Sequence, residues 1–293
     1  SALPSSIGPH RFRDNGELKY SLRSLEAFAP WIRKIYIVTN GQIPRWLDTS
    51  HKRISIITHG MIFPDTSHLP TFNSQAIELQ LHKIPNLSRR FLYLNDDVFF
   101  GRAVSRSDFI TSSGGQYIYF QPTRLPMNTD EGPVHDRAYA HTLRIIEQRW
   151  GWQCLRWLPA HVPQLYDRDI LAQIEDLLVD ECRETRTHRF RSKNDLVLRI
   201  IYAFFLLESS ALEKGHEARL LDWGSRDYSF VCLNEHTWEM WRAFLQIGTR
   251  RRPKFFCVND DLGDVSIHHR ILWSFRQFLR FYFPKPSSFE KRL

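Results

Sequence analysis

Residues 90–101 of the chain read RFLYLNDDVFFG. The apolar, aromatic run at 91–94 is typical of a buried strand, and Asn95, Asp96 and Asp97 follow it directly. Two adjacent carboxylates between apolar runs are costly to bury without a cation or a set of donors. In open α/β sheets, ligands bind at the carboxyl ends of strands, and Mg²⁺ takes one or two carboxylates plus phosphate oxygens. The stretch therefore predicts a metal and phosphate site at Asp96 and Asp97; the alternative is a polar hairpin turn, which Asn and Asp also favour.

The segments before this stretch alternate between helix and strand. Apolar spacing predicts a helix from about Asn15 to Phe28, with Asp14 and Glu17 as a capping box. Apolar, β-branched runs predict strands at 35–38 and 54–57. This order is typical of a wound α/β sheet.

The rest of the chain continues the mixed pattern. We expect a helix capped by Asn73 or Ser74, where phosphate binding and simple capping are both open readings. Further strands are expected at 117–120 and 254–258, a long exposed loop at 123–132, and helices at 138–150, after Asp167, at 195–208 and around 271–279. The predicted organisation is one domain, 1–293, with a first α/β half at 11–122, a mostly helical segment at 123–228 and closing elements at 229–293.

Composition limits the class of protein. The net charge of +8 and the pI near 9.4 favour anionic partners, but no nucleic-acid-binding motif is present, so we expect no nucleic-acid partner. No apolar run reaches the roughly 20 residues that span a bilayer. The cysteines form no CxxC pair, which argues against zinc and for reduced thiols, with one disulfide still open; they are Cys154, Cys182, Cys232 and Cys257.

Two later segments carry candidate functional side chains. In LPAHVPQLYDRDI, His161 stands between Pro159 and Pro163, which hold it on non-helical backbone. It is a candidate general base, phosphate donor or metal ligand, or simply a hydrogen-bonded loop histidine. The basic segment TRTHRFRSKND, 185–195, could bind phosphate through arginine or be a solvated cationic loop. A second strand followed by Asn-Asp-Asp occurs at 259–261, which favours a site shared with 95–97.

Together these stretches resemble the Stealth family of sugar-1-phosphate transferases, which includes bacterial capsule and exopolysaccharide phosphotransferases and the catalytic subunit of the lysosomal-enzyme N-acetylglucosamine-1-phosphotransferase. The similarity spans residues 11–290. It is carried by RFRDNGELKYSLRSL, IYIVTNGQIPRWL, FPDTSHLPTFNSQAIELQLHKIPNLS, FLYLNDDVFFG, LPAHVPQLYDR, THRFRSKND, KFFCVNDDL and FPKPSSFE. It implies a Rossmann-like, nucleotide-sugar-transferase-like wound sheet flanked by helices, with a helical insertion.

The resemblance also implies a reaction. A sugar-1-phosphate, from hexose or N-acetylhexosamine, would pass from a nucleotide-diphosphate sugar, UDP-linked by expectation, to a hydroxyl of an acceptor oligosaccharide or polysaccharide. A nucleoside monophosphate would leave, and Mg²⁺ or Mn²⁺ would assist in capsule or exopolysaccharide synthesis.

The family motifs assign roles to residues of this chain. Asp96 and Asp97 would hold the metal or accept the acceptor proton, His161 would act as base or phosphate donor, and Arg191 would neutralise the phosphate with His188. Asn259 and Asp260 would complete the donor or metal site, with Asp97 and Asp260 as metal ligands. The donor pocket would be lined by Arg13, Asp14, Asn15 and Gly16.

One departure accompanies the resemblance. A strand segment of the type DVVYTWVDGSDP normally precedes the RFRDNGEL helix, and this sequence lacks it. We expect an amino-terminal truncation and weaker nucleotide binding. The rival functions are a metal-dependent glycosyltransferase and a degenerate, non-catalytic binding member. A bacterial cytoplasmic location with peripheral membrane association is expected, or a Golgi lumen in a eukaryote; the sequence indicates no oligomeric state.

Overall fold

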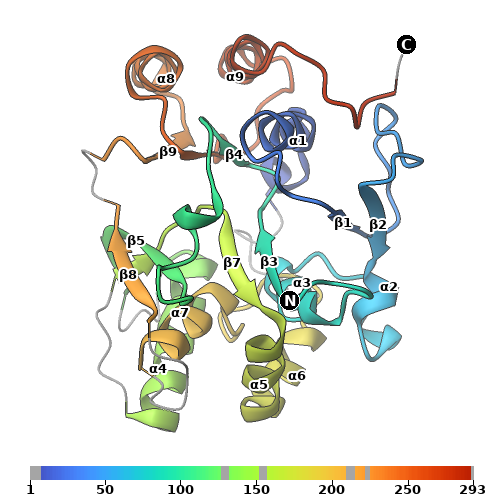
Figure 1. Ribbon diagram of the computed structural model, residues 1–293, viewed down its shortest axis with the longest axis vertical. Coiled ribbons are helices and arrows are strands. Elements are labelled where there is room, and N and C mark those ends of the chain that lie inside the picture. Colours follow the sequence, from blue (N-terminus) through green and yellow to red (C-terminus); the bar gives the residue numbers. More distant parts are fainter. Residues whose placement is uncertain (1–7, 127–131, 152–156, 209–214, 222–224, 292–293) are drawn as a thin grey trace.

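Figure 1 shows a mixed α/β protein, and the computed structural model describes residues 8–126, 132–151, 157–208, 215–221 and 225–291. The α/β class expected from the sequence is confirmed. The described helices are α1 Glu17–Phe28, α2 His59–Ile62, α3 Ser74–Glu78, α4 Val134–Trp150, α5 Arg168–Leu177, α6 Val179–Thr187, α7 Leu198–Glu208, α8 Thr237–Leu245 and α9 Arg270–Tyr282. The described strands are β1 Ile35–Thr39, β2 Ile54–Thr58, β3 Arg90–Tyr93, β4 Val98–Phe100, β5 Tyr117–Arg124, β6 Trp157–Pro159, β7 Gln164–Asp167, β8 Glu217–Leu220, β9 Tyr228–Leu233 and β10 Phe255–Asp260.

Within the described residues, the strands pair in four small sheets. β1 and β2 are parallel, β3 and β7 are antiparallel, β10 lies between β4 and β9, and β5 lies between β6 and β8. These pairings do not form the one continuous wound sheet that we expected. One physical reason is the turn between β3 and β4, which separates these two strands into different sheets. β3 pairs with β7, and β4 pairs with β10.

The start of α1 differs from the expected capping box. The helix begins at Glu17, and its N-cap is Gly16, whose φ of 88° lies in the left-handed region that favours glycine. Asp14 accepts from the Gly16 amide instead of capping the helix, and Glu17 accepts from the backbone and side-chain nitrogens of Asn15. These three hydrogen bonds fix the RFRDNGEL segment in an irregular conformation just before the helix.

Other boundaries shift in the predicted mostly helical segment. α4 begins at Val134, before the predicted position 138, and α7 begins at Leu198, after the predicted position 195. β5 runs to Arg124 and so occupies the start of the predicted loop at 123–132; residues 127–131 of that loop lie outside the described part of the chain. The segment also contains β6, β7 and β8, so it is less helical than we expected.

Two buried apolar clusters lie toward opposite ends of the molecule. α7 is buried around almost its whole circumference and packs with α4, α5 and β5. At the opposite end of the long axis, α8 and α9 pack against the β4–β10–β9 sheet (Figure 1). No described helix is both long and apolar enough to cross a bilayer. Of the cysteines, Cys182, Cys232 and Cys257 are free, and Cys154 lies outside the described residues.

Candidate active site

β4, which follows the first Asn-Asp-Asp stretch, pairs antiparallel with β10, which leads into the second. The Val258 amide donates to the Asp97 carbonyl over 3.1 Å, and the Cys257 thiol donates to Asp97 Oδ2 over 3.3 Å. Cys257 is fully buried, and burial followed by the Asp97 charge raises its pKa well above the usual value. The thiol therefore stays protonated and serves Asp97 as a donor.

His161 contacts the other oxygen of the same carboxylate. Its Nε2 lies 3.3 Å from Asp97 Oδ1, and its Nδ1 lies 3.1 Å from an Arg199 guanidinium nitrogen. Arginine can only donate, so Nδ1 accepts and Nε2–H donates to Asp97. Arg199 also donates to the Tyr139 hydroxyl. A chain of contacts thus runs from α4 through α7 and His161 to Asp97.

The pKa values of the neighbouring Asp96 and Asp97 carboxyl groups are shifted in opposite directions. Burial alone would raise the pKa of Asp97, but its electrostatic interaction and hydrogen bond with His161, together with the Cys257 thiol, lower it overall. Asp96 has an exposed side chain. The surrounding protein, and then the charge of Asp97, raise the pKa of Asp96 to about 6. Asp97 is therefore held as the anion, and Asp96 is the more readily protonated of the two.

Glu78, at the end of α3, adds a third acid to this group. Its side chain is 7% exposed, and burial raises its pKa against the opposing charges of Arg199, Arg191 and His161. Glu78 also shares a hydrogen bond with Tyr93, the last residue of β3. This buried acid lies close to the predicted site residues although the sequence pattern did not single it out.

Two of the predicted donor-pocket residues bind the carboxylate of Asp260. Arg13 donates to both oxygens of Asp260, over 3.0 and 2.7 Å, and Asn15 donates to one of them over 3.4 Å. Arg13 also binds the Gly263 and Val265 carbonyls, so its guanidinium is fully engaged. Asp260, expected as a metal ligand, is instead the partner of Arg13 in this structure.

Two other expected residues lie at the margin of this group. The charge of Asp14 raises the pKa of Asp96, as a lesser cause than burial and Asp97, which places Asp14 beside the first carboxylate pair. Asn259 is exposed near the end of β10 and contacts Cys232. Nothing in the structure brings Asn259 to Asp97.

A group of cations faces the acids. Arg191 donates to the Ser74 hydroxyl over 2.9 Å. Burial and then the charge of Arg191 lower the pKa of Arg11. Burial also lowers the pKa of His135; Asp136 opposes this shift, and the like charges of Arg191, Arg11 and Arg199 add to it. Arginines gathered next to carboxylates form a site for an anionic ligand that also needs a cation or a proton acceptor.

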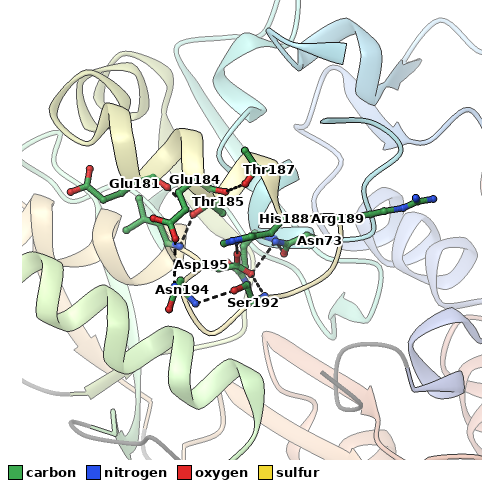
Figure 2. A network of polar contacts seen from close by, with 12 residues as sticks. Asn73, Glu181, Glu184, Thr185, Thr187, His188, Arg189, Ser192, Asn194 and Asp195 are labelled. Atoms are coloured by element: carbon green, nitrogen blue, oxygen red, sulfur yellow. Dashed lines mark hydrogen bonds and ion pairs between the residues drawn. The ribbon is translucent and has the colours of Figure 1, made fainter. Parts of the chain in front are cut away.

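His188 belongs to a separate network, which Figure 2 shows around Asp195. Asp195 is completely buried, and its carboxylate accepts from Asn73 Nδ2 over 2.9 Å and from the Ser192 amide over 2.7 Å. Its other oxygen lies 2.8 Å from His188 Nδ1. The Phe72 amide donates to the Arg189 carbonyl over 2.7 Å and ties the same two segments together. The network therefore holds the basic segment at 188–195 against the start of α3, and His188 supports Arg191 rather than joining it.

This network predicts a pH-dependent contribution to stability. The Asp195 hydrogen bond, opposed by burial, raises the pKa of His188. A raised folded-state pKa stabilises the fold fully below the unfolded value of about 6.5, and the contribution is lost as pH rises through the folded value. His188→Gln should therefore lower the melting temperature more at pH 6 than at pH 9. His268→Gln, at an exposed histidine, is the control; equal losses at both pH values would contradict the prediction.

Arg199, Glu78 and Cys257 are among the site residues that the sequence pattern did not single out, although the sequence does contain an indication for the first two. Arg199 is the only charged residue in the apolar run at 196–207, and a lone charge in a buried helix requires a partner. Glu78 is likewise the only charged residue in the mostly apolar stretch AIELQL at 76–81. Cys257, inside an apolar strand, looks like any buried thiol.

The donor chemistry fits a hard cation through oxygen atoms only. Asp97, His161 and Cys257 place ligand atoms within 4.8 Å of one another, but the thiol is protonated and His161 Nδ1 accepts from Arg199. The carboxylates of Asp96 and Asp97, with ligand phosphate oxygens, match what Mg²⁺ accepts. The carboxylate pair is therefore the part of this group whose donor chemistry fits a divalent ion.

Comparison with known proteins agrees with the motifs. Profiles of three Stealth conserved regions match this chain: region 2 over 11–118, region 3 over 160–208 and region 4 over 247–293. The matched regions contain every site residue named above except Tyr139, His135 and Cys232.

Two bacterial relatives align with nearly the whole chain, and a mammalian relative aligns with part of it. An exopolysaccharide phosphotransferase of Streptomyces coelicolor is 36% identical over 294 aligned positions, covering 98% of this chain and 47% of the relative. One from Mycobacterium leprae is 33% identical over 289 positions, covering 96% and 50%. Mouse N-acetylglucosamine-1-phosphotransferase subunits alpha/beta are 56% identical over 119 positions, covering 41% of this chain and 10% of the relative. The chain thus spans about half the length of the bacterial relatives, and it belongs to the Stealth family.

Proposed function

We propose that this chain contains the catalytic part of a phosphotransferase that moves a sugar-1-phosphate from a nucleotide-diphosphate sugar to a hydroxyl of an acceptor saccharide. A nucleoside monophosphate is the second product, and exopolysaccharide or capsule synthesis is the process served. The observation that carries the proposal is the Asp96–Asp97 pair, whose Asp97 is held by His161 and Cys257, next to an acid, Glu78, that interacts with the charges of Arg199 and Arg191. The names of the relatives support the same reaction class.

The acids and cations divide the work of such a transfer. The acceptor oxygen attacks the phosphorus that carries the sugar, the bond from phosphorus to the nucleotide oxygen breaks, and the acceptor proton passes to a carboxylate. Asp96 is the more exposed and more easily protonated member of the pair, so it is the better proton acceptor. Arg191 and Arg11 would stabilise negative charge on the transferred phosphate and the leaving nucleotide.

His161 acts on Asp97 rather than on the substrate in this arrangement. Both ring nitrogens are engaged, one by Arg199 and one by Asp97, so no lone pair is open to take the acceptor proton. Its role is to orient Asp97 and to keep that carboxylate ionised. A divalent cation bound at the pair would neutralise the donor diphosphate, which supports Mg²⁺ or Mn²⁺ as the cofactor.

The donor itself is expected at the parallel β1–β2 pair. The carboxyl ends of these strands lead into Asn40 and Gly41 and into His59 and Gly60, the usual place for a nucleotide in a Rossmann-like arrangement. A UDP-linked sugar remains the expected donor.

Product analysis tests the proposal. A full-length protein is incubated with a UDP-sugar, Mg²⁺ and an oligosaccharide acceptor, and the nucleotides are separated. UMP is the expected product, because attack on phosphorus releases the monophosphate. UDP would support the rival, a metal-dependent glycosyltransferase, since the same arginines could stabilise a departing diphosphate. Tight UDP-sugar binding with no turnover would support a non-catalytic binding protein.

A further inference from the structure

The three most exposed large apolar side chains of the described residues lie on α8 and α9, and two further tryptophans of these helices are also exposed. Trp238 is 79% exposed, Phe281 73%, Leu245 63%, Trp273 53% and Trp241 46%. On α8, the spacing 238, 241 and 245 forms a stripe along one face of the helix. Single exposed apolar residues are ordinary, but five on two neighbouring helices form a patch that requires an explanation.

The opposite faces of these helices are already used in the core. Phe244 of α8 stacks on Phe275 and Phe278 of α9, with ring centroids 6.0 and 4.7 Å apart. Phe278 in turn contacts Phe256 of β10 at 6.0 Å. Both helices therefore rest on the same sheet, and their exposed residues point away from it. Figure 1 shows the two helices end-on and side by side as the outermost elements at one end of the molecule.

Positive charge accompanies the aromatic side chains. Residues 270–289 contain Arg270, Arg276, Arg280 and Lys285 and no acidic residue. Arg242 is exposed on α8 between Trp241 and Leu245, and Glu239 is the only acid of that helix. Tryptophan and phenylalanine beside arginine are typical of surfaces that rest in the headgroup region of an anionic bilayer.

We infer that the outward face of α8 and α9 binds the surface of an anionic membrane. The aromatic rings enter the interface between headgroups and acyl chains, and the arginines and Lys285 contact lipid phosphates. A second copy of the chain is a poorer occupant, because a symmetric dimer would bring the same arginines face to face. The inference does not depend on the proposed reaction.

Vesicle binding tests the inference. The purified chain is sedimented with phosphatidylcholine vesicles that contain or lack phosphatidylglycerol. We expect binding to the anionic vesicles, weakened by high salt, and little binding to the neutral ones. Trp238→Gln with Phe281→Gln should reduce the partition coefficient at least about tenfold, because two interfacial rings are lost. Both residues are so exposed that the fold should persist, which circular dichroism checks.

Two further variants separate the contributions. Leu177→Gln with Val179→Gln removes exposed apolar side chains that are 43% and 50% exposed at the other end of the molecule, and binding should not change. Arg270→Glu with Arg280→Glu should abolish the preference for anionic lipid. The inference is overturned if the unaltered chain ignores anionic vesicles, if the Trp238→Gln, Phe281→Gln variant binds normally, or if binding is equal on neutral vesicles. Dimerisation that this variant abolishes, without vesicle binding, would identify a second copy as the occupant and also overturn it.

Discussion

Asp97→Asn should reduce turnover by about 10³-fold or more while leaving the chain folded. Asparagine keeps the size of the side chain, and its oxygen still accepts from His161 Nε2–H. The negative charge is lost, however, and with it the attraction for a divalent cation. The loss should appear in kcat under saturating UDP-sugar and Mg²⁺, measured in a full-length protein.

The control must separate lost chemistry from lost structure. Asp180→Asn changes an exposed acid of α6 that pairs only with Arg183 among the described contacts, and it should retain full turnover. The melting temperature of Asp97→Asn should stay close to that of the unaltered protein, because only the weak thiol donor of Cys257 loses its acceptor. Near-normal turnover would refute the role of Asp97, and an unfolded variant would make that role structural.

Asp195→Ala should have the largest effect on stability. The substitution removes the acceptor for Asn73, Ser192 and His188, and it leaves buried donors without partners. Breaking a buried charged network in this way costs about 3–5 kcal/mol. For a chain of this size the melting temperature should fall by roughly 10 °C. Turnover should fall as well, because Arg191 is carried by the segment that the network holds.

Asp195→Asn is the informative companion variant. Its carbonyl can accept from Asn73 and Ser192, and its amide can donate to His188 if that ring takes the other tautomer. Its loss of stability should therefore be much smaller than that of Asp195→Ala, and it should no longer depend on the protonation of His188. Asp180→Ala, at the exposed α6 position, should change stability by no more than about 0.5 kcal/mol. A melting temperature of Asp195→Ala within 2 °C of the unaltered protein, a margin of roughly 1 kcal/mol, would show that the network does not hold the loop.

The sequence was sufficient to predict those elements whose residue pattern lies within one short stretch of the chain. The apolar run before Asn95, the helical spacing after Gly16 and the prolines around His161 placed β3, α1 and the His161 loop correctly. The repeated Asn-Asp-Asp stretch predicted a shared site. The β4–β10 pairing brings the two neighbouring strands together, but Asp260 binds Arg13 and no described contact joins Asn259 to Asp97.

The pairing of strands and side chains that are far apart in the sequence could not be predicted from residue patterns within short stretches. Which strand β3 joins depends on the turn at 94–97 and on β7, more than 60 residues later, so the four small sheets were not foreseeable. The same reason applies to Asp260, whose carboxylate binds Arg13 from the other end of the chain. The importance of Arg199 could have been predicted, because a lone charged residue in an apolar helix requires a buried partner. The identity of that partner could not, because His161 comes from another segment of the chain.

The fate of the donor phosphorus tests the central claim most directly. A UDP-sugar labelled with ³²P in the phosphate that carries the sugar is supplied to a full-length protein with Mg²⁺ and an oligosaccharide acceptor. If Asp96 and Asp97 serve a sugar-1-phosphate transfer, the label should appear in the oligosaccharide, and Asp97→Asn should prevent its appearance. Label that remains in the nucleotide while the sugar moves to the acceptor would contradict the account.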